Sequence, residues 1–152
     1  MKRVIAFLLL VGVLFGFTFL RKDEISVFAN CEKIVMVSSV QYDSFENYVE
    51  NGDCYYYKIE KDKSEEFIKN IKKYDYSGLS FYYDKNVNFE YFSKYFNNLT
   101  KNASKIDNYC CFYGYYPYFN NYKIIDGKKI NVQLVQTDRE WILGFPLILT
   151  GY

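Results

Sequence analysis

Hydrophobic residues recur at helical spacing in two segments, residues 62–74 and residues 86–101. Positions three and four apart lie on one face of a helix, so each segment carries a continuous apolar stripe. The two stripes are Phe67, Ile68, Ile71 and Tyr74, and Phe89, Phe92, Tyr95, Phe96 and Leu99. Such stripes are typical of helices that pack on a core, so we predict two amphipathic helices.

Helix-start signals precede both stripes. Asp62 is followed three residues later by Glu65, which is the spacing of a capping box. Asn86 or Asn88 is suited to cap the second helix, because Asn is among the preferred N-cap residues.

Most of the remaining chain has the pattern of β-strands. Residues 33–40, 53–60 and 80–84 are short runs rich in Val, Tyr and Phe. Further on, Asp126-Gly127 separates two β-rich runs, which is a hairpin signal. The second run alternates, and its Ile-bearing face is predicted to be buried. Its two faces are Ile130, Val132 and Leu134, and Asn131, Gln133 and Val135.

A last strand is predicted for residues 141–152. Gly144 and Pro146 lie inside it, and both residue types are disfavoured in the interior of a central strand. We therefore expect a bulge or an edge position at this point.

The stretch 112–119, FYGYYPYF, contains six aromatic residues. We interpret it as the first strand of a C-terminal sheet, with Pro117 disturbing the alternation of its faces. One face is predicted to join the core, and the other to form an exposed aromatic strip on which a sugar or a base can stack. The residues of this candidate strip are Tyr113, Tyr115 and Phe119.

The order of the elements is strand, helix, short strand, helix and then a run of strands. It predicts an α+β fold in which two helices cover one face of an antiparallel sheet. A single domain is assigned to residues 31–152, and an N-terminal segment with a short linker to residues 1–30. One domain is the expected number for a chain of this length.

Residues 4–20 are uncharged and apolar, and two basic residues precede them. A helix of seventeen residues spans about 25 Å, at the lower end for a bilayer crossing, and preceding basic residues stay in the cytoplasm. The segment is therefore either an uncleaved anchor with the domain outside the cell or a signal peptide cleaved after Val27-Phe28-Ala29. The charged residues 21–24 make a long spacer before that cleavage site, which favours the anchor.

Charge and composition exclude several functions. Residues 31–152 contain fifteen Lys or Arg and sixteen Asp or Glu, a net charge of 15 − 16 = −1, so no nucleic-acid partner is expected. The chain has no His, which removes His-based nucleophile activation and His-containing zinc sites. We therefore assign no catalytic, cofactor-binding or metal-binding residue. One enzymatic alternative is a hydrolase of envelope glycans that uses Glu65 with Glu66, or Asp138 with Glu140.

Four Cys residues leave two redox states open. Disulfides form outside the cytoplasm, and the pairing that we would test joins Cys54 to Cys110 or Cys111. The two adjacent residues are not expected to pair with each other, because that geometry is strained. In the alternative, all four thiols, including that of Cys31, are reduced.

The C-terminal residues resemble the signature of the YwmB family. Asn131 and Gln133 match a strand of the form Asn-hydrophobic-Gln-hydrophobic. A following Gly-x-Pro-hydrophobic-hydrophobic strand that closes on a terminal Tyr is matched by Gly144, Pro146, Leu147, Ile148 and Tyr152. The resemblance covers residues 89–152. It implies a fold similar to the TATA-box-binding protein, in an extracytoplasmic protein of spore-forming Gram-positive bacteria, and it implies no activity, because fold does not carry function.

These observations predict a non-catalytic accessory or binding domain of the cell envelope, with a role in wall or spore assembly. Its expected partners are the membrane, through the N-terminal segment, and an envelope protein or glycan that binds the sheet by strand addition or by stacking. The alternatives are the carboxylate-dependent hydrolase and, least favoured, nucleic-acid binding through the sheet.

Overall fold

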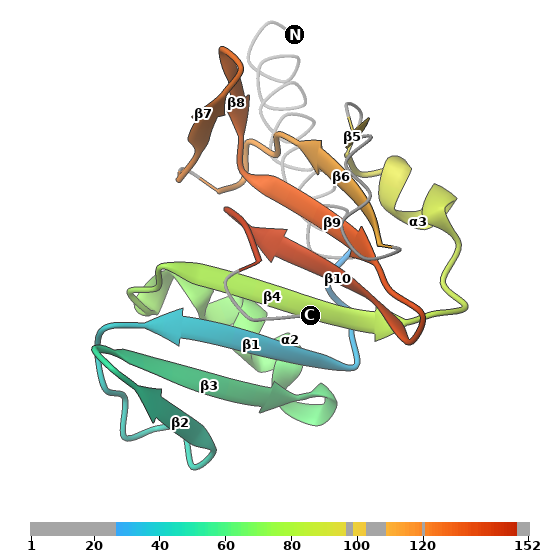
Figure 1. The fold of residues 1–152 in the computed structure, drawn as a ribbon. Coiled ribbons are helices and arrows are strands. Elements are labelled where there is room, and N and C mark those ends of the chain that lie inside the picture. The colour runs from blue at the N-terminus through green and yellow to red at the C-terminus, as the bar shows by residue number, and fades with distance from the viewer. Residues whose placement is uncertain (1–26, 97–98, 103–108, 120, 149–152) are drawn as a thin grey trace, which may run out of the picture.

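The structure, a computed structural model, describes residues 27–96, 99–102, 109–119 and 121–148. It is an α+β fold with one large antiparallel sheet and two α-helices (Figure 1), so the fold class is confirmed at this level. The apolar run 4–20 lies outside the described residues. Within the described ranges, no helix combines the length and the apolar character needed to cross a membrane.

The elements follow one another as the sequence order predicts. The first half of the chain forms β1 (Lys33–Ser38), β2 (Tyr48–Asn51), β3 (Cys54–Glu60), α2 (Lys61–Asn70), the 3₁₀ helix η1 (Ile71–Lys73) and β4 (Gly78–Asp84). The second half forms α3 (Phe89–Ser93), β5 (Thr100–Asn102), β6 (Cys110–Gly114), β7 (Lys123–Ile125), β8 (Lys128–Ile130), β9 (Val132–Gln136) and β10 (Glu140–Phe145). The strands predicted from residues 33–40, 53–60 and 80–84 are confirmed as β1, β3 and β4.

The main sheet has the strand order β2-β3-β1-β4-β10-β9-β6-β5, and all neighbouring strands are antiparallel. The first four strands come from the first half of the chain and the last four from the second half. The pairing of β4 with β10 therefore joins two structural halves. A separate two-stranded sheet, β7–β8, projects beyond the end of the second half (Figure 1).

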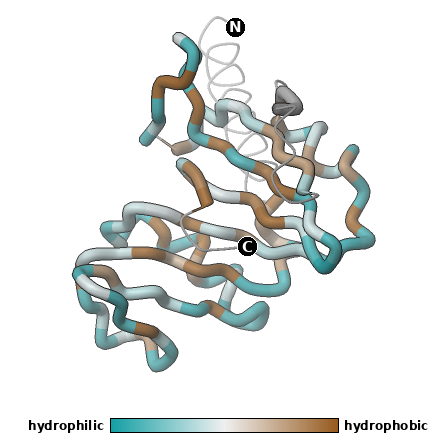
Figure 2. The backbone as a smooth tube through the Cα atoms, viewed as in Figure 1, coloured by the Kyte–Doolittle hydropathy of each residue, from teal (hydrophilic) through white to brown (hydrophobic). Residues whose placement is uncertain are grey.

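One face of the main sheet carries the hydrophobic core. Phe67 of α2 and Phe92 of α3 are buried in the same cluster as Phe81 of β4 and Leu143 of β10. Both helices thus pack on one face, as predicted. Figure 2 shows hydrophobic segments along the central strands. Burial of each such side chain contributes about 1.5–3 kcal/mol.

The predicted capping box of the first helix is wrong. Helix α2 begins at Lys61, its N-cap is Glu60 in extended conformation, and no side chain caps it. Because β3 runs directly into the helix, Asp62 falls inside the first turn instead of before it. Glu65, free of the capping role, accepts a hydrogen bond from Lys69 Nζ at 2.7 Å.

Helix α3 is shorter than predicted, but one of its two predicted caps is confirmed. Asn88 is the N-cap, and its Oδ1 accepts a hydrogen bond from Glu90 N at 3.1 Å. Phe92 and Phe96 are buried, so the predicted stripe packs on the core even though Phe96 follows the end of the helix.

Strand β9 is buried on both faces. Val132 and Leu134 are fully buried, as predicted for the Ile-bearing face, whereas Ile130 is half-buried. Asn131 and Gln133 on the other face are buried as well. The reason is that other chain segments return to these amides, so that Asn131 binds Tyr116 and Phe119, and Gln133 accepts from Ile148 N.

The predicted edge position near the C-terminus is wrong, because β10 lies between β4 and β9 and ends before Pro146. The presence of Gly at position 144 has a different structural explanation. The chain turns back over it, so that an added Cβ would lie 2.5 Å from Ile148 Cγ1 and 2.6 Å from Ile148 N. Only Gly leaves room for this close approach. Residues 149–152 of the predicted strand lie outside the described residues.

The folded domain begins before the boundary predicted at residue 31. Val27 and Phe28 are buried in the core. The ring of Phe28 packs on that of Phe81, with the centroids 4.6 Å apart. The hydroxyl groups of Tyr83 and Tyr91 both donate to Val27 O, at 3.0 and 2.9 Å. Residues 27 and 28 therefore belong to the domain and not to a linker.

Candidate functional site

A cleft of about 360 Å³ lies between the end of η1, the end of the stretch 112–119 and the end of β10. This volume is within the range of small-ligand pockets. Lining residues with aromatic or polar groups include Lys72, Asp75, Tyr76, Tyr118, Phe119 and Asn121.

The wall formed by the stretch 112–119 is held in place by a buried amide. Strand β6 ends at Gly114, and the chain then leaves the sheet. Asn131 Oδ1 accepts from Tyr116 N at 2.7 Å, and Asn131 Nδ2 donates to Tyr116 O and to Phe119 O, both at 2.8 Å. All three bonds are buried, so this side chain fixes a loop that no backbone ladder supports.

The opposite wall is fixed by the end of β1. Ser38 Oγ donates to Asp75 O at 2.6 Å, and Asp75 N donates to Tyr42 Oη at 2.6 Å. Ser77 N donates to Val37 O at 2.8 Å. The loop that carries Asp75 and Tyr76 is thus positioned by hydrogen bonds on both sides.

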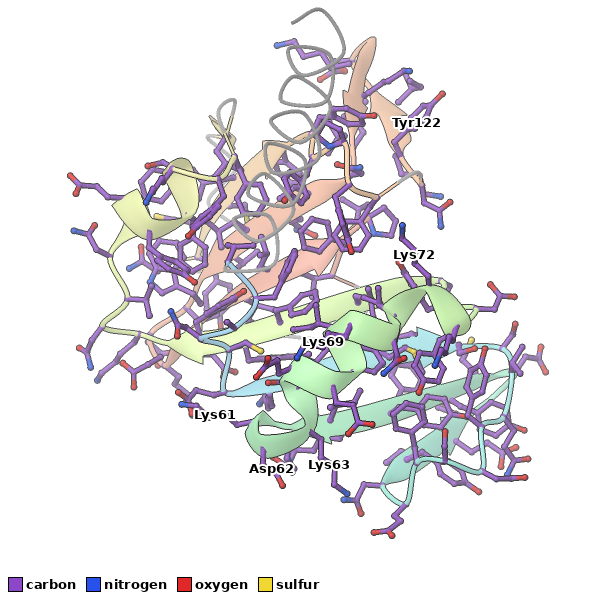
Figure 3. All side chains as sticks on the ribbon, turned by 180° about the vertical axis from the view of Figure 1, so that it is seen from behind. Lys61, Asp62, Lys63, Lys69, Lys72 and Tyr122 are labelled. Atoms are coloured by element: carbon purple, nitrogen blue, oxygen red, sulfur yellow. The ribbon has the colours of Figure 1, made fainter. Side chains whose placement is uncertain are left out.

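The cleft combines aromatic rings with one cationic and one anionic side chain. Lys72 Nζ lies 5.8 Å from the ring centre of Tyr118, and Figure 3 shows Lys72 pointing away from α2 toward the half that carries Tyr122. Burial, and secondarily the neighbouring Tyr118, raise the pKa of Tyr76 to about 12. Tyr76 is therefore a neutral hydroxyl at physiological pH, which donates and accepts hydrogen bonds.

This arrangement of aromatic and polar side chains suits the binding of a small ligand. Aromatic rings stack on apolar ring faces, and a few convergent polar groups fix the orientation of a ligand. Among the described residues, no group of three or more His, Cys, Asp and Glu side chains is placed to hold a metal ion.

The exposed aromatic strip predicted from Tyr113, Tyr115 and Phe119 does not form. Tyr113 is half-buried on β6, Tyr115 is 39% exposed, and Phe119 is 6% exposed in the core. The alternation fails because the strand ends at Gly114, so the following residues do not keep a two-residue period. The ring available at the cleft is that of Tyr118, which the sequence interpretation assigned to the core face.

The remaining cleft residues were missed from the sequence. Lys72, Asp75 and Tyr76 come from a segment more than forty positions before Tyr118. The sequence contains one partial indication of the cleft, because Pro117 marks the point at which the strand pattern breaks.

Of the two redox states left open by the sequence, the structure has the reduced one, without the bond from Cys54 to Cys110 or Cys111. All four cysteines are free thiols in the structure. Cys54 is on β3 and Cys110 and Cys111 are on β6, with four strands between them. Five strand spacings amount to about 24 Å, far beyond the reach of a disulfide.

The candidate catalytic carboxylates are also outside the cleft. Glu65 and Glu66 are exposed on α2, and hydrogen bonding to Lys69 lowers the pKa of Glu65, the opposite of what a general acid needs. Asp138 is exposed, and Glu140 lies 3.7 Å from Lys33 Nζ in an ion pair.

A second hollow of about 270 Å³ lies beside α2. It contains Glu66 together with Glu46, Glu60, Lys58 and Lys63, a mixed set in which Lys58 and Glu60 are paired at 2.7 Å. Its three Glu and two Lys side chains are exposed and of mixed sign, so it offers weaker chemistry than the cleft.

Comparison of the chain with protein-family models, with curated proteins and with solved structures found no match.

Proposed function

We propose that this protein is a membrane-anchored, extracytoplasmic, non-catalytic domain that binds a glycan of the cell envelope in the cleft beside Tyr118. The single observation that carries the proposal is the combination in one cleft of the Tyr118 ring with Lys72, Asp75, Tyr76 and Asn121. A sugar ring has apolar faces that stack on aromatic side chains, and its rim of hydroxyl groups needs hydrogen-bond donors and acceptors.

An uncleaved anchor is supported by the burial of Val27 and Phe28. Cleavage after Ala29 would remove both side chains from the core and leave the hydroxyl groups of Tyr83 and Tyr91 without their shared acceptor. Loss of a buried Phe alone costs about 3–5 kcal/mol, a large part of the stability of a small domain. We therefore infer that the mature protein keeps the chain N-terminal to Ala29.

Membership of the YwmB family, with its TATA-box-binding-protein-like fold, is part of the proposal. It is supported by the structural roles of the residues that carry the resemblance. Asn131 binds the chain segment at Tyr116, and Gln133 binds the segment at Ile148. Gly144 leaves room for the close approach of Ile148. A shared set of such positions is what a common fold would require.

The test is a binding experiment with the full-length protein in mild detergent and purified, insoluble cell-wall glycan. We expect retention of the wild-type protein. Tyr118→Ala should weaken binding about fivefold to tenfold, because it removes one stacking ring. Tyr115→Ala is the matched control, since Tyr115 belongs to the same stretch but is not among the residues lining the cleft.

Two outcomes would contradict the proposal. In one, the wild-type protein is not retained on wall glycan at any salt concentration. In the other, Tyr115→Ala and Tyr118→Ala weaken retention equally, which would locate binding outside the cleft. N-terminal sequencing of the protein from cells tests the anchor separately, since a start at Asn30 would refute it.

A further inference from the structure

The hairpin β7–β8 carries a cluster of exposed apolar side chains. Asp126 and Gly127 have positive φ angles of 51° and 75°, which confirms the predicted hairpin turn. Seven large hydrophobic residues are exposed in the described ranges, and three of them lie between positions 122 and 125, in or next to β7. These three are Tyr122, Ile124 and Ile125, at 43%, 61% and 38% exposure.

The same hairpin is basic. It carries Lys123, Lys128 and Lys129 against a single acid, Asp126, a net charge of 3 − 1 = +2 in a domain whose own charge is −1. The cross-strand pairs are Ile124 with Lys129 and Ile125 with Lys128, so each face of the ribbon presents an Ile beside a Lys. Lys129 Nζ also lies 4.6 Å from the ring centre of Tyr122.

We propose that this hairpin docks onto the anionic headgroups of a lipid bilayer, with Ile124 and Ile125 entering the boundary between headgroups and acyl chains. Lysine stems lie along apolar surface while the ammonium groups reach the phosphates. Tyr is enriched at this depth of a membrane because its ring is apolar and its hydroxyl is polar. Attraction to anionic lipid requires unmatched positive charge, which the hairpin has, whereas the rest of residues 31–152 carries a net charge of −1 − 2 = −3.

The position of the hairpin in the fold supports this partner. The ring of Phe28 lies 6.0 Å from the ring of Phe119, which is three residues before Tyr122. Phe28, near the start of the described chain, therefore packs in the core against the segment that leads into the hairpin. The six residues 21–26 span at most about 20 Å, so an anchored domain would hold this hairpin close to the bilayer. Figure 2 shows the hydrophobic segment in the projecting ribbon.

The inference goes beyond glycan binding and uses only the anchor from the proposed function. Its test is the full-length protein with the reporter substitution Ile124→Trp, reconstituted in vesicles of phosphatidylcholine alone or mixed with phosphatidylglycerol. The native Trp141 is buried and gives a constant background. In anionic vesicles we expect the introduced Trp to emit at shorter wavelength and to be quenched by lipids brominated near the headgroup.

Charge variants then test the role of the lysines. Each Lys near an anionic surface contributes about fivefold to the docking equilibrium, so the change K123Q/K128Q/K129Q should lower the docked-to-undocked ratio on the order of 100-fold. The matched control is K63Q/K73Q/K85Q, which removes the same charge from exposed positions outside the hairpin and should leave the ratio unchanged.

The proposal is overturned if the introduced Trp has the same emission and quenching in neutral and anionic vesicles, or if the control variant lowers docking as much as the hairpin variant. Flotation of the vesicles separates the two hypotheses. Protein that floats without hairpin quenching refutes the docking surface alone, and protein that does not float refutes the anchor.

Discussion

The two halves of the sheet are closed in different ways. In the first half, the ten-residue helix α2 packs on β3 and β1, and its Phe67 and Ile68 are buried in the hydrophobic core. In the second half, α3 has only five residues, and much of the cover is coil. Two coil segments, residues 115–119 and 146–148, also pack against this half, held by the side chains of Asn131, just before β9, and of Gln133 on β9.

This difference decides where each half is vulnerable. A helix satisfies its own backbone groups and contributes an apolar stripe, so its packing tolerates small changes of shape. Coil has no internal ladder, and its buried N–H and C=O groups need specific partners. The second half therefore depends on a few buried amides in addition to its apolar core, and the candidate cleft is built on the coil that they hold.

The largest effect is expected for Asn131→Ala. The substitution removes the Asn131 hydrogen bonds to Tyr116 N and Phe119 O and leaves Tyr116 O with only the long bond from Phe119 N, so the free energy of unfolding should fall by about 3–5 kcal/mol. Urea unfolding followed by the fluorescence of Trp141, the only Trp in the chain, measures this change.

Two variants make the Asn131 result specific. Asn131→Asp keeps the acceptor for Tyr116 N but loses both donors and buries a charge, so it should be no better than Ala. Asn86→Ala, at an exposed position, should change stability by no more than about 0.5 kcal/mol. A loss below about 1 kcal/mol for Asn131→Ala would show that the coil is held by packing alone, and the contrast between the halves would disappear.

The second prediction concerns residues 146–148, the segment that returns over Gly144. Gly144→Ala places a methyl group 2.6 Å from Ile148 N and 2.5 Å from Ile148 Cγ1, so the segment must move off the sheet. We expect a loss of about 2–3 kcal/mol, the upper part of the range for overpacked sites. The hydrogen bond from Ile148 N to Gln133 Oε1 should be lost with it, which faster amide exchange at Ile148 would report.

The double variant G144A/I148A separates the two clashes. Removing the Ile148 side chain relieves the contact with Cγ1 but leaves the contact with the backbone nitrogen. The cost of adding Gly144→Ala to Ile148→Ala should therefore be smaller than its cost in the wild type, but not zero. Full additivity of the two substitutions would mean that the segment does not press on Gly144.

The sequence predicted the first half better than the second for a physical reason. The stripe of α2 and the β-rich runs of β3 and β4 are local sequence patterns, which can be recognised without knowledge of distant contacts. Even there the helix start was misplaced, because Glu60 takes its extended backbone from β3 and no capping side chain is needed. Helix position thus depended on the neighbouring strand and not on the Asp62 signal.

In the second half, the decisive interactions link residues that no period connects. Asn131 reaches Tyr116, fifteen positions earlier, and Gln133 reaches Ile148, fifteen positions later. The alternation of β9 marked both amides as belonging to the face opposite Ile130, but it could not show that residues 116–119 and 146–148 return to these amides and bury them. The cleft was missed for the same reason, since Lys72 and Tyr118 meet only after the halves have packed together.

The smallest predicted effect tests how well the first half excludes water. Cys31 is fully buried near α2, and burial raises its thiol pKa from 9.0 to about 11. Below pH 9 the thiol is neutral in both the folded and the unfolded chain and has no pH-dependent effect. Between pH 9 and 11 the unfolded chain loses this proton while the folded chain keeps it, so the folded state becomes less favourable, by about 2 kcal/mol at pH 11.

Cys31→Ala should remove this step, which urea unfolding at pH 7, 9 and 10.5 would show as a shallower loss of stability than in the wild type. Cys54→Ala, at a partly exposed position on β3, is the control and should retain the wild-type slope. Parallel curves for the wild type and Cys31→Ala would mean that water reaches the thiol, and that the helix-covered half is no better sealed than the half closed by coil.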